Sequence, residues 1–140
     1  MKISVEQYLI RLSNDLKLPN FYSIITQGQY RLQLPEIEPI EIFETRENIM
    51  MTAPVAELLD GLDEEKLFSY LMYANFLGQG TARSSLSLHP NDKTLILSNY
   101  TYVDIDYSYF KDLIEEFFNY VDYMKTHLAT KIPTFLKEPT

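Results

Sequence analysis

The sequence contains no cysteine and no tryptophan, and its 20 Asp and Glu outnumber its 12 Lys and Arg. Without cysteine the chain can form neither disulfides nor thiolate metal sites, which is compatible with a reducing compartment. Most nucleic-acid binding is driven by attraction between a basic protein and the phosphates, and a protein with a formal net charge of −8 lacks this attraction. We therefore expect no nucleic-acid partner.

Long apolar runs are missing as well. No run approaches the about 20 apolar residues that a helix needs to span a bilayer. The first residues also lack the continuous apolar core of a signal peptide. The sequence therefore predicts no membrane insertion.

The apolar content is nevertheless sufficient for a core, since 46% of the 140 residues are hydrophobic and 14% are aromatic. The first residues predict a helix that starts with a capping box, Ser4 and Gln7, and ends before Pro19. Its apolar stripe consists of Val5, Tyr8, Leu9, Leu12 and Leu16.

From residue 21 to residue 55, apolar residues tend to occupy every second position. This alternation predicts three antiparallel strands at 29–34, 37–45 and 48–55. Pro39 cannot donate to a strand ladder, so we expect it at a strand end, a bulge or an edge.

The second half predicts helices over about 63–77 and 106–128, each with an aspartate as N-cap, and strands over 82–88 and 94–101. The order α-β-β-β-α-β-β-α predicts one α+β domain over residues 1–130, with helices packed on a twisted, largely antiparallel sheet. Residues 131–140, which include two prolines, are predicted to form a flexible C-terminal tail.

No cluster of residues makes a strong catalytic or metal site. Gly78 and Gly80 follow a predicted helix, so they fit a helix end better than a phosphate loop, which precedes one. Asp104 and Asp106 lack the further oxygen ligands that a cation needs, and neither histidine has an evident nucleophile as partner. The sequence therefore offers no strong catalytic constellation, and we expect no metal and no cofactor.

The predicted second helix has more apolar surface than one small domain usually covers. Over residues 67–77 only Ser69 and Asn75 lack apolar bulk. A helix that is apolar all round must be covered on more than one side, and a symmetric homodimer is the common solution in a small soluble protein. The alternative is that the first or third helix covers the second side within one chain.

Some apolar residues of the first half fall outside the simple patterns. These are Ile10, Phe21, Tyr22, Phe43 and Met50. They could form apolar pockets or an exposed sheet edge that takes up an extended segment of another protein. Ordinary filling of the core is the alternative.

The segment 71–81, LMYANFLGQGT, resembles the class I chaperones of bacterial type III secretion, the Tir-chaperone-like family. The order of elements is similar over about residues 4–128. Two positions depart from the family pattern: Arg83 stands where small residues are usual, and Met124 stands near a frequent tryptophan. Further similarity lies at 86–88, 95–97, Asp106, Phe110 and 117–120.

The resemblance implies a cytoplasmic bacterial homodimer without enzymatic activity that acts in protein export and virulence. Such dimers bind the N-terminal segment of one or more secreted effectors in extended form and keep it soluble and export-competent. The implied partners are therefore effectors, a second copy of the chain, and the secretion ATPase or sorting platform.

By position, the resemblance assigns two sets of candidate contacts. The dimer interface is expected at Leu67, Leu71, Phe76, Arg83 and Leu86. Effector contacts are expected at Val5, Leu9, Tyr30, Leu32, Ile42, Phe43 and Met50.

Two other classes of function stay open. One is a monomeric α+β sensory or adaptor domain that binds a small apolar ligand, which requires a large closed pocket inside one subunit. The other is a small hydrolase or metal enzyme that uses Asp104, Asp106 or the glutamates around the strand at 37–45.

Overall fold

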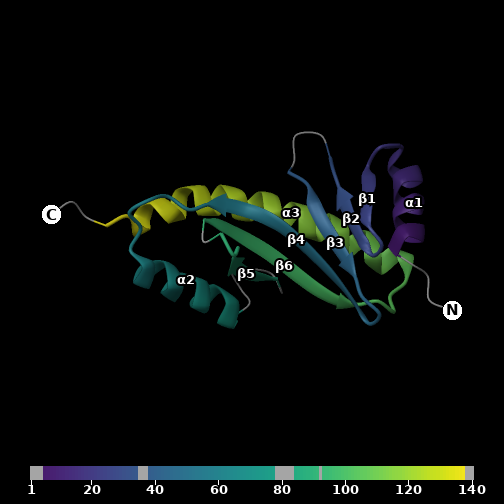
Figure 1. The fold of residues 1–140 in the computed structure, drawn as a ribbon. Coiled ribbons are helices and arrows are strands. Elements are labelled where there is room, and N and C mark those ends of the chain that lie inside the picture. The colour runs from purple at the N-terminus through teal and green to yellow at the C-terminus, as the bar shows by residue number, and fades with distance from the viewer. Residues whose placement is uncertain (1–4, 35–37, 78–83, 92, 138–140) are drawn as a thin grey trace. The chain divides into compact units, whose positions relative to one another are not determined.

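The structure is a computed structural model that describes residues 5–34, 38–77, 84–91 and 93–137 (Figure 1). Its strands form one sheet in the order β1-β2-β3-β4-β6-β5, in which β1–β2, β2–β3, β3–β4 and β5–β6 pair antiparallel. The elements are α1 (Val5–Leu16), β1 (Tyr22–Thr26), β2 (Gln29–Leu32), β3 (Ile40–Glu44), β4 (Asn48–Glu57), α2 (Glu64–Leu77), β5 (Ser85–Leu88), β6 (Thr94–Tyr102), α3 (Tyr107–Lys131) and the 3-10 helix η1 (Ile132–Phe135).

The α+β class and the five predicted strands are confirmed, and the structure adds a strand, β1, that the sequence did not predict. Pro39 directly precedes β3, which confirms its expected place at a strand end. Both predicted aspartate caps are also confirmed. Asp63 Oδ1 accepts hydrogen bonds from the N–H groups of Glu65 and Lys66 at 3.1 and 3.3 Å. Asp106 Oδ1 accepts one from the N–H of Tyr109 at 2.8 Å.

Two compact units make up the chain. The first unit contains residues 1–53 and 100–118, and the second contains residues 54–99 and 119–140. Strands β4 and β6 and helix α3 each run from one unit into the other. Each unit has a core of its own.

In the first unit, α1 packs through the stripe that its sequence predicts. The buried residues are Val5, Tyr8, Leu9 and Leu12, while Leu16 is 42% exposed. The helix begins beside β3, since the N–H of Val5 donates to Glu44 Oε2 at 3.3 Å, where the positive end of the helix dipole favours a carboxylate. The predicted cap at Ser4 lies outside the described residues.

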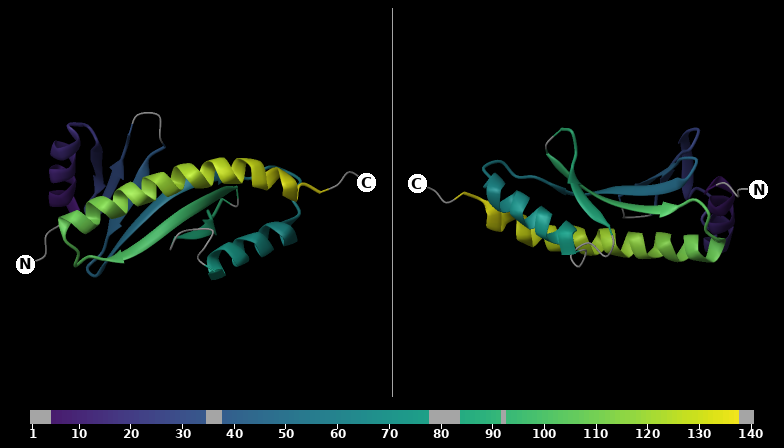
Figure 2. Two further views of the ribbon diagram at one scale, coloured as in Figure 1. Left: turned by 180° about the vertical axis from the view of Figure 1, so that it is seen from behind. Right: turned by 90° about the horizontal axis from the view of Figure 1, so that it is seen from below.

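In the second unit, α2 lies beside the C-terminal part of α3 (Figure 2). Its buried stripe consists of Leu67, Leu71 and Ala74, spaced by one helical turn. The predicted helix stop at Gly78 lies outside the described residues.

The segment after α3 differs from the flexible tail predicted for 131–140. Residues Ile132–Phe135 form η1, in which Ile132 and Phe135 are 3% and 7% exposed. The carbonyl of Phe135 accepts a 2.7 Å hydrogen bond from the N–H of Asp63. The segment is therefore part of the core of the second unit, because both apolar side chains are buried and the Phe135 ring contacts Tyr70 of α2.

Candidate protein-binding surfaces

Strand β1 is an outer strand of the sheet and presents a free backbone edge. The N–H of Gln33 donates to the carbonyl of Phe21 at 2.8 Å, so Phe21 faces β2. Because antiparallel strands alternate, the backbone groups of Tyr22 and Ile24 face the other way. No strand lies beyond β1 among the residues that the structure describes. Its outward groups are therefore available for pairing with another chain.

The side chains of this strand are also open to solvent. Ile24 and Ile25 are 53% and 40% exposed. The register with β2 shifts between Ile24 and Thr26, so that Ile25 has no partner on β2. We call the outward backbone groups of Tyr22 and Ile24, with these two isoleucine side chains, the β1 edge.

A tight turn fixes this edge to the rest of the sheet. Gly28 has a φ of 81°, and its carbonyl accepts a 2.7 Å hydrogen bond from the N–H of Glu44. A Cβ at this position would lie 2.9 Å from the Glu44 carbonyl oxygen. Glycine is therefore required here for both its conformation and its size.

Aromatic contacts anchor α1 to the start of α3 in the same unit. The hydroxyl of Tyr8 donates to the carbonyl of Ile105, and that of Tyr107 donates to Asp15 Oδ2, each at 2.6 Å. The guanidinium of Arg11 lies 4.1 Å from the Tyr107 ring centre, a cation–π contact. Burial, and then the hydrogen bond to Asp15, raise the pKa of Tyr107 to about 12.

A second apolar surface lies on the solvent side of the sheet in the first unit. Phe43 and Met50 are direct partners on β3 and β4, and both are half-buried. Tyr100 and Tyr102, near the end of β6, are 66% and 76% exposed. Strand β6 lies next to β4. We call these four residues the open-face patch.

The second unit exposes apolar residues on α2. Four of them, which we call the α2 face, lie away from the buried stripe and are 46% to 88% exposed: Phe68, Met72, Tyr73 and Phe76. Phe68, Met72 and Phe76 are spaced by four residues and share one side of the helix. The first and third helices therefore leave this side uncovered in the described part of the chain.

Asn75 ties α2 to the outer strand β5. Its Nδ2 donates to the carbonyl of Leu86, and its Oδ1 accepts from the N–H of the same residue, each at 2.8 Å. One side-chain amide thus satisfies both backbone groups of one strand residue.

A ring cluster joins α2 to α3. His127 Nε2 lies 3.1 Å from the Tyr70 hydroxyl, and the imidazole stacks on Tyr123 at 5.8 Å between ring centres. Tyr70 also contacts Phe135, at 5.6 Å between ring centres. Burial, and then Tyr123, raise the pKa of Tyr70. Because His127 is engaged on both sides, it supports the packing of the two helices.

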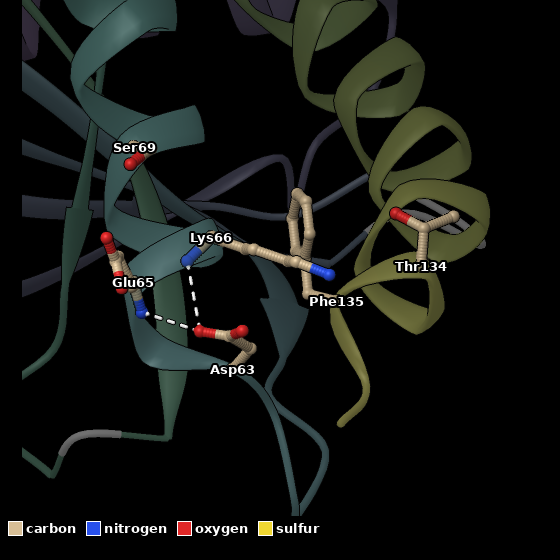
Figure 3. A pocket seen from close by; sticks show the side chains of 6 residues that line it. All are labelled: Asp63, Glu65, Lys66, Ser69, Thr134 and Phe135. Atoms are coloured by element: carbon tan, nitrogen blue, oxygen red, sulfur yellow. Dashed lines mark hydrogen bonds between the residues drawn. The ribbon is translucent and has the colours of Figure 1, made fainter. Parts of the chain in front are cut away.

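An open cleft of about 530 Å³ lies between the start of α2 and η1 (Figure 3). Lys66 extends toward Phe135, and the lining also includes the acidic Asp63 and Glu65. A smaller apolar cleft of about 240 Å³ has Val55, Leu128 and other residues of the second unit in its lining. Neither cleft is the large closed pocket that the small-ligand alternative requires.

The acidic residues proposed for catalysis have structural roles or stand apart. Asp106 caps α3, and Asp104 is exposed. Glu41 forms a salt bridge of 3.1 Å with Arg31 on the neighbouring strand. Among the residues described, no group of three or more His, Asp or Glu is placed to hold a metal ion.

Comparison with known proteins assigns the family. Residues 8–125 match the family model described as the Tir chaperone protein (CesT) family. The chain belongs to this family. The resemblance of the segment 71–81 to Tir-chaperone-like proteins is therefore confirmed. No curated protein matches this CesT-family chain.

Several solved structures share the fold of this CesT-family chain. The ExsC–ExsE complex contains a chain with a TM-score of 0.71 at 14% identity, over 90% of this chain and 96% of that one. A chain of the HopA1–SchA chaperone–effector complex has a TM-score of 0.64 at 10% identity, over 87% of this chain and 93% of that one. A chain of the ExoU–SpcU complex, from the type III secretion system of Pseudomonas aeruginosa, has a TM-score of 0.62 at 17% identity, over 98% of this chain and 100% of that one. At these identities the likeness concerns the fold.

The residues suggested for effector contact fall into two groups. Phe43 and Met50 reach the solvent side of the sheet, as described for the open-face patch. The others are 0% to 5% exposed and lie in the core of the first unit: Val5, Leu9, Tyr30, Leu32 and Ile42.

The residues suggested for the dimer interface divide likewise. Phe76 is 88% exposed, whereas Leu67, Leu71 and Leu86 are buried within the second unit. Arg83 lies outside the described residues. The CesT-family motif around Ala74 and Asn75 thus contributes one exposed aromatic residue and one amide that holds β5.

Sequence reasoning missed both the β1 edge and the role of Asn75. The isoleucine pair at 24–25, followed by Gly28, was an available signal for a strand and a hairpin. No local pattern announces the Asn75 contact, since its partner lies 11 residues further on and in a different element.

Proposed function

We propose that this member of the CesT family is a type III secretion chaperone that binds an extended N-terminal segment of a secreted effector. The observation that carries the proposal is the β1 edge, whose backbone groups and two isoleucine side chains face solvent. Among similar folds, HopA1–SchA is a chaperone–effector complex, and ExoU–SpcU is a heterodimeric complex of a type III secretion system.

The client segment adds a strand to the β1 edge. Its backbone pairs with Tyr22 and Ile24, which gives affinity without a requirement for a particular sequence. Alternate apolar side chains of the segment contact Ile24 and Ile25. A disordered client loses conformational entropy when it binds, so contacts spread over a long segment suit it better than one deep pocket.

Further apolar contacts in the first unit extend this surface. Phe43 and Met50 contact the client directly, together with the exposed Ile10 of α1. Of the residues suggested for effector contact, those buried in the core support these side chains from inside the first unit. Because effectors differ in sequence, an adaptable methionine suits such a surface.

The α2 face joins two copies of the chain into a homodimer. An exposed row of Phe68, Met72 and Phe76 is unusual for a small soluble protein, and a two-fold axis lets the same row cover itself. Leu67 and Leu71 support the row from the buried side of the same helix. The dimer offers two copies of the β1 edge to one client.

The protein acts by binding and not by catalysis. It works in the bacterial cytoplasm, keeps its client soluble, and hands it to the ATPase or sorting platform of the secretion apparatus. The described part of the chain has no helix that meets the length and apolarity needed to cross a bilayer.

Calorimetry with N-terminal effector segments tests the proposal after pull-down and mass spectrometry have identified a client. The variant Ile24→Asp/Ile25→Asp should weaken binding by more than tenfold, because it places two charges where apolar client side chains lie. The control Ser108→Asp adds a charge on the exposed side of α3 and should bind as the wild type does.

Hydrogen exchange supplies the second arm of this experiment. Client binding should slow the exchange of the Tyr22 and Ile24 amides, which face away from β2. A client that binds without slowing either amide would rule out strand addition at the β1 edge.

A further inference from the structure

Strand β5 is the other outer strand of the sheet, and a side chain closes its edge. The N–H of His89 donates to the carbonyl of Thr94 at 2.8 Å, so His89 faces β6. By alternation, the backbone groups of Leu86 and Leu88 face away from β6. The Asn75 amide binds both outward groups of Leu86 at 2.8 Å each.

The contact imitates a neighbouring strand. In an antiparallel ladder, a residue of a hydrogen-bonded pair donates its N–H to the opposite residue and accepts a hydrogen bond from that residue at its carbonyl. Asparagine and glutamine are the uncharged side chains that offer a donor and an acceptor side by side, and asparagine does so on the shorter stem. Asparagine therefore suits this position on α2, which packs against β5.

Strand β5 carries no charged side chain, no proline and no register shift that would protect its edge. Its sequence is Ser-Leu-Ser-Leu, and Ser85 and Ser87 are exposed. Lysine, proline or a bulge usually prevents a strand of this kind from pairing with another chain. Without the Asn75 amide, Leu86 would present an unpaired donor and acceptor on a short, apolar strand.

We propose that Asn75 closes the β5 edge to strand addition and so leaves β1 as the edge that accepts an incoming strand. The closure of β5 stands on the two hydrogen bonds alone. The direction of a client to β1 rests on the proposed function.

The wild-type protein gives the first test through hydrogen exchange measured by NMR. The amides of Leu86 and Leu88 both face away from β6, but only that of Leu86 meets Asn75. The Leu86 amide should therefore exchange more slowly than the Leu88 amide, by up to about tenfold, the upper end of what one hydrogen bond gives. Equal rates for the two amides would overturn the proposal.

The variant Asn75→Ala gives the second test. It should raise the exchange of the Leu86 amide about tenfold and should self-associate beyond the wild-type species in sedimentation at rising concentration. Asn75→Asp keeps an acceptor for the Leu86 N–H but loses the donor, so it should protect the amide and still associate. Asn99→Ala is the matched control, since the Asn99 side chain donates to the Ser84 hydroxyl, at 3.3 Å, and not to a backbone group of Leu86.

A double variant separates closure of the edge from loss of the α2–β5 contact. Ser87→Lys adds a charge to the exposed side of β5 without restoring the Asn75 bonds. Asn75→Ala/Ser87→Lys should therefore return to the wild-type state of association while the Leu86 amide stays unprotected. Persisting association would mean that loosened packing, and not an open edge, drives it, and would overturn the proposal.

Client binding keeps this inference distinct from the proposed function. With a client present, the wild type should gain protection at Tyr22 but not at Leu88, whereas Asn75→Ala should gain it at both. A protein that binds no client at β1, yet shows the association results above, would retain the closure of β5 and lose the proposed function.

Discussion

Tyr107 connects two helices of the first unit through its hydroxyl and its ring. The hydroxyl donates to Asp15, and the ring lies beneath Arg11. Burial, and then this hydrogen bond, raise the pKa of Tyr107 from 10 in the unfolded chain to about 12. A raised pKa in the folded state means that the stabilisation is complete below pH 10 and is lost as the pH rises through about 12.

Replacement of the hydroxyl tests this account. Tyr107→Phe should lower the free energy of unfolding at pH 7 by about 1 kcal/mol, because it removes one hydrogen bond. Between pH 10 and 12 the variant should lose less stability than the wild type, since it no longer has this phenol to ionise. Urea unfolding at pH 7, 9 and 11 measures both effects, with Tyr109→Phe, an exposed tyrosine of α3, as control. Equal pH dependence of wild type and variant would contradict the assignment.

A comparison of two glycines distinguishes the cost of backbone strain from the cost of a steric clash. Gly28 and Gly61 share a φ of 81°, so alanine at either costs about 1–2 kcal/mol of backbone strain. At Gly28 the new Cβ also meets the Glu44 carbonyl oxygen at 2.9 Å, whereas at Gly61 nothing lies within 4 Å. Gly28→Ala should therefore destabilise the protein by about 1–3 kcal/mol more than Gly61→Ala in urea unfolding. Equal losses of stability in the two variants would show that the hairpin shifts enough to accommodate the methyl group at residue 28.

At the scale of elements, helices were easier to predict than the sheet edges. Helix α3 was predicted because apolar residues recur every three or four positions from Phe110 to Leu128. Strand β1 was missed because four of its five residues are exposed, and an edge strand without a buried face has no period of two. Pro133 suggested a loose tail, but proline is compatible with the first turn of η1, and Phe135 then packs against α2.

The candidate surfaces were predicted only in part, for a related reason. Periodicity identifies apolar residues on an element, but it does not tell which of them the same chain covers. Leu71 and Phe76 were equivalent in the sequence, yet one is 8% and the other 88% exposed. That difference depends on the packing of α2 against η1, which is distant in sequence, and against β5, the next strand along the chain.

The contrast between these two residues gives a prediction for α2. Phe76→Ala should convert the proposed dimer to a monomer with its fold intact, since truncation of an aromatic hot spot at an interface costs about 2 kcal/mol or more of association energy. Leu71→Glu should instead lower the stability of the fold, because it buries a charge within the second unit. Sedimentation and thermal unfolding distinguish the two outcomes, with Tyr102→Ala as the exposed aromatic control in the first unit. An unchanged dimer in Phe76→Ala would place the interface elsewhere.

For the whole molecule, three elements belong to both compact units. Strands β4 and β6 and helix α3 each continue across the boundary between the units. An unfolded unit would therefore leave half of each of these elements without packing partners, and short isolated helices and strands are marginal in water. The two cores should consequently unfold together.

A core substitution in either unit tests this coupling. Leu128→Ala in the second unit and Leu9→Ala in the first each truncate a side chain that is 0% exposed, which should cost about 2–5 kcal/mol. Hydrogen exchange in the native protein should then show faster opening of the most protected amides in both units for each variant, by a similar factor. Circular dichroism should show one urea transition at a lower midpoint. If Leu128→Ala accelerates exchange in the second unit alone, the units open independently, and the continuous strands and helix do not couple them.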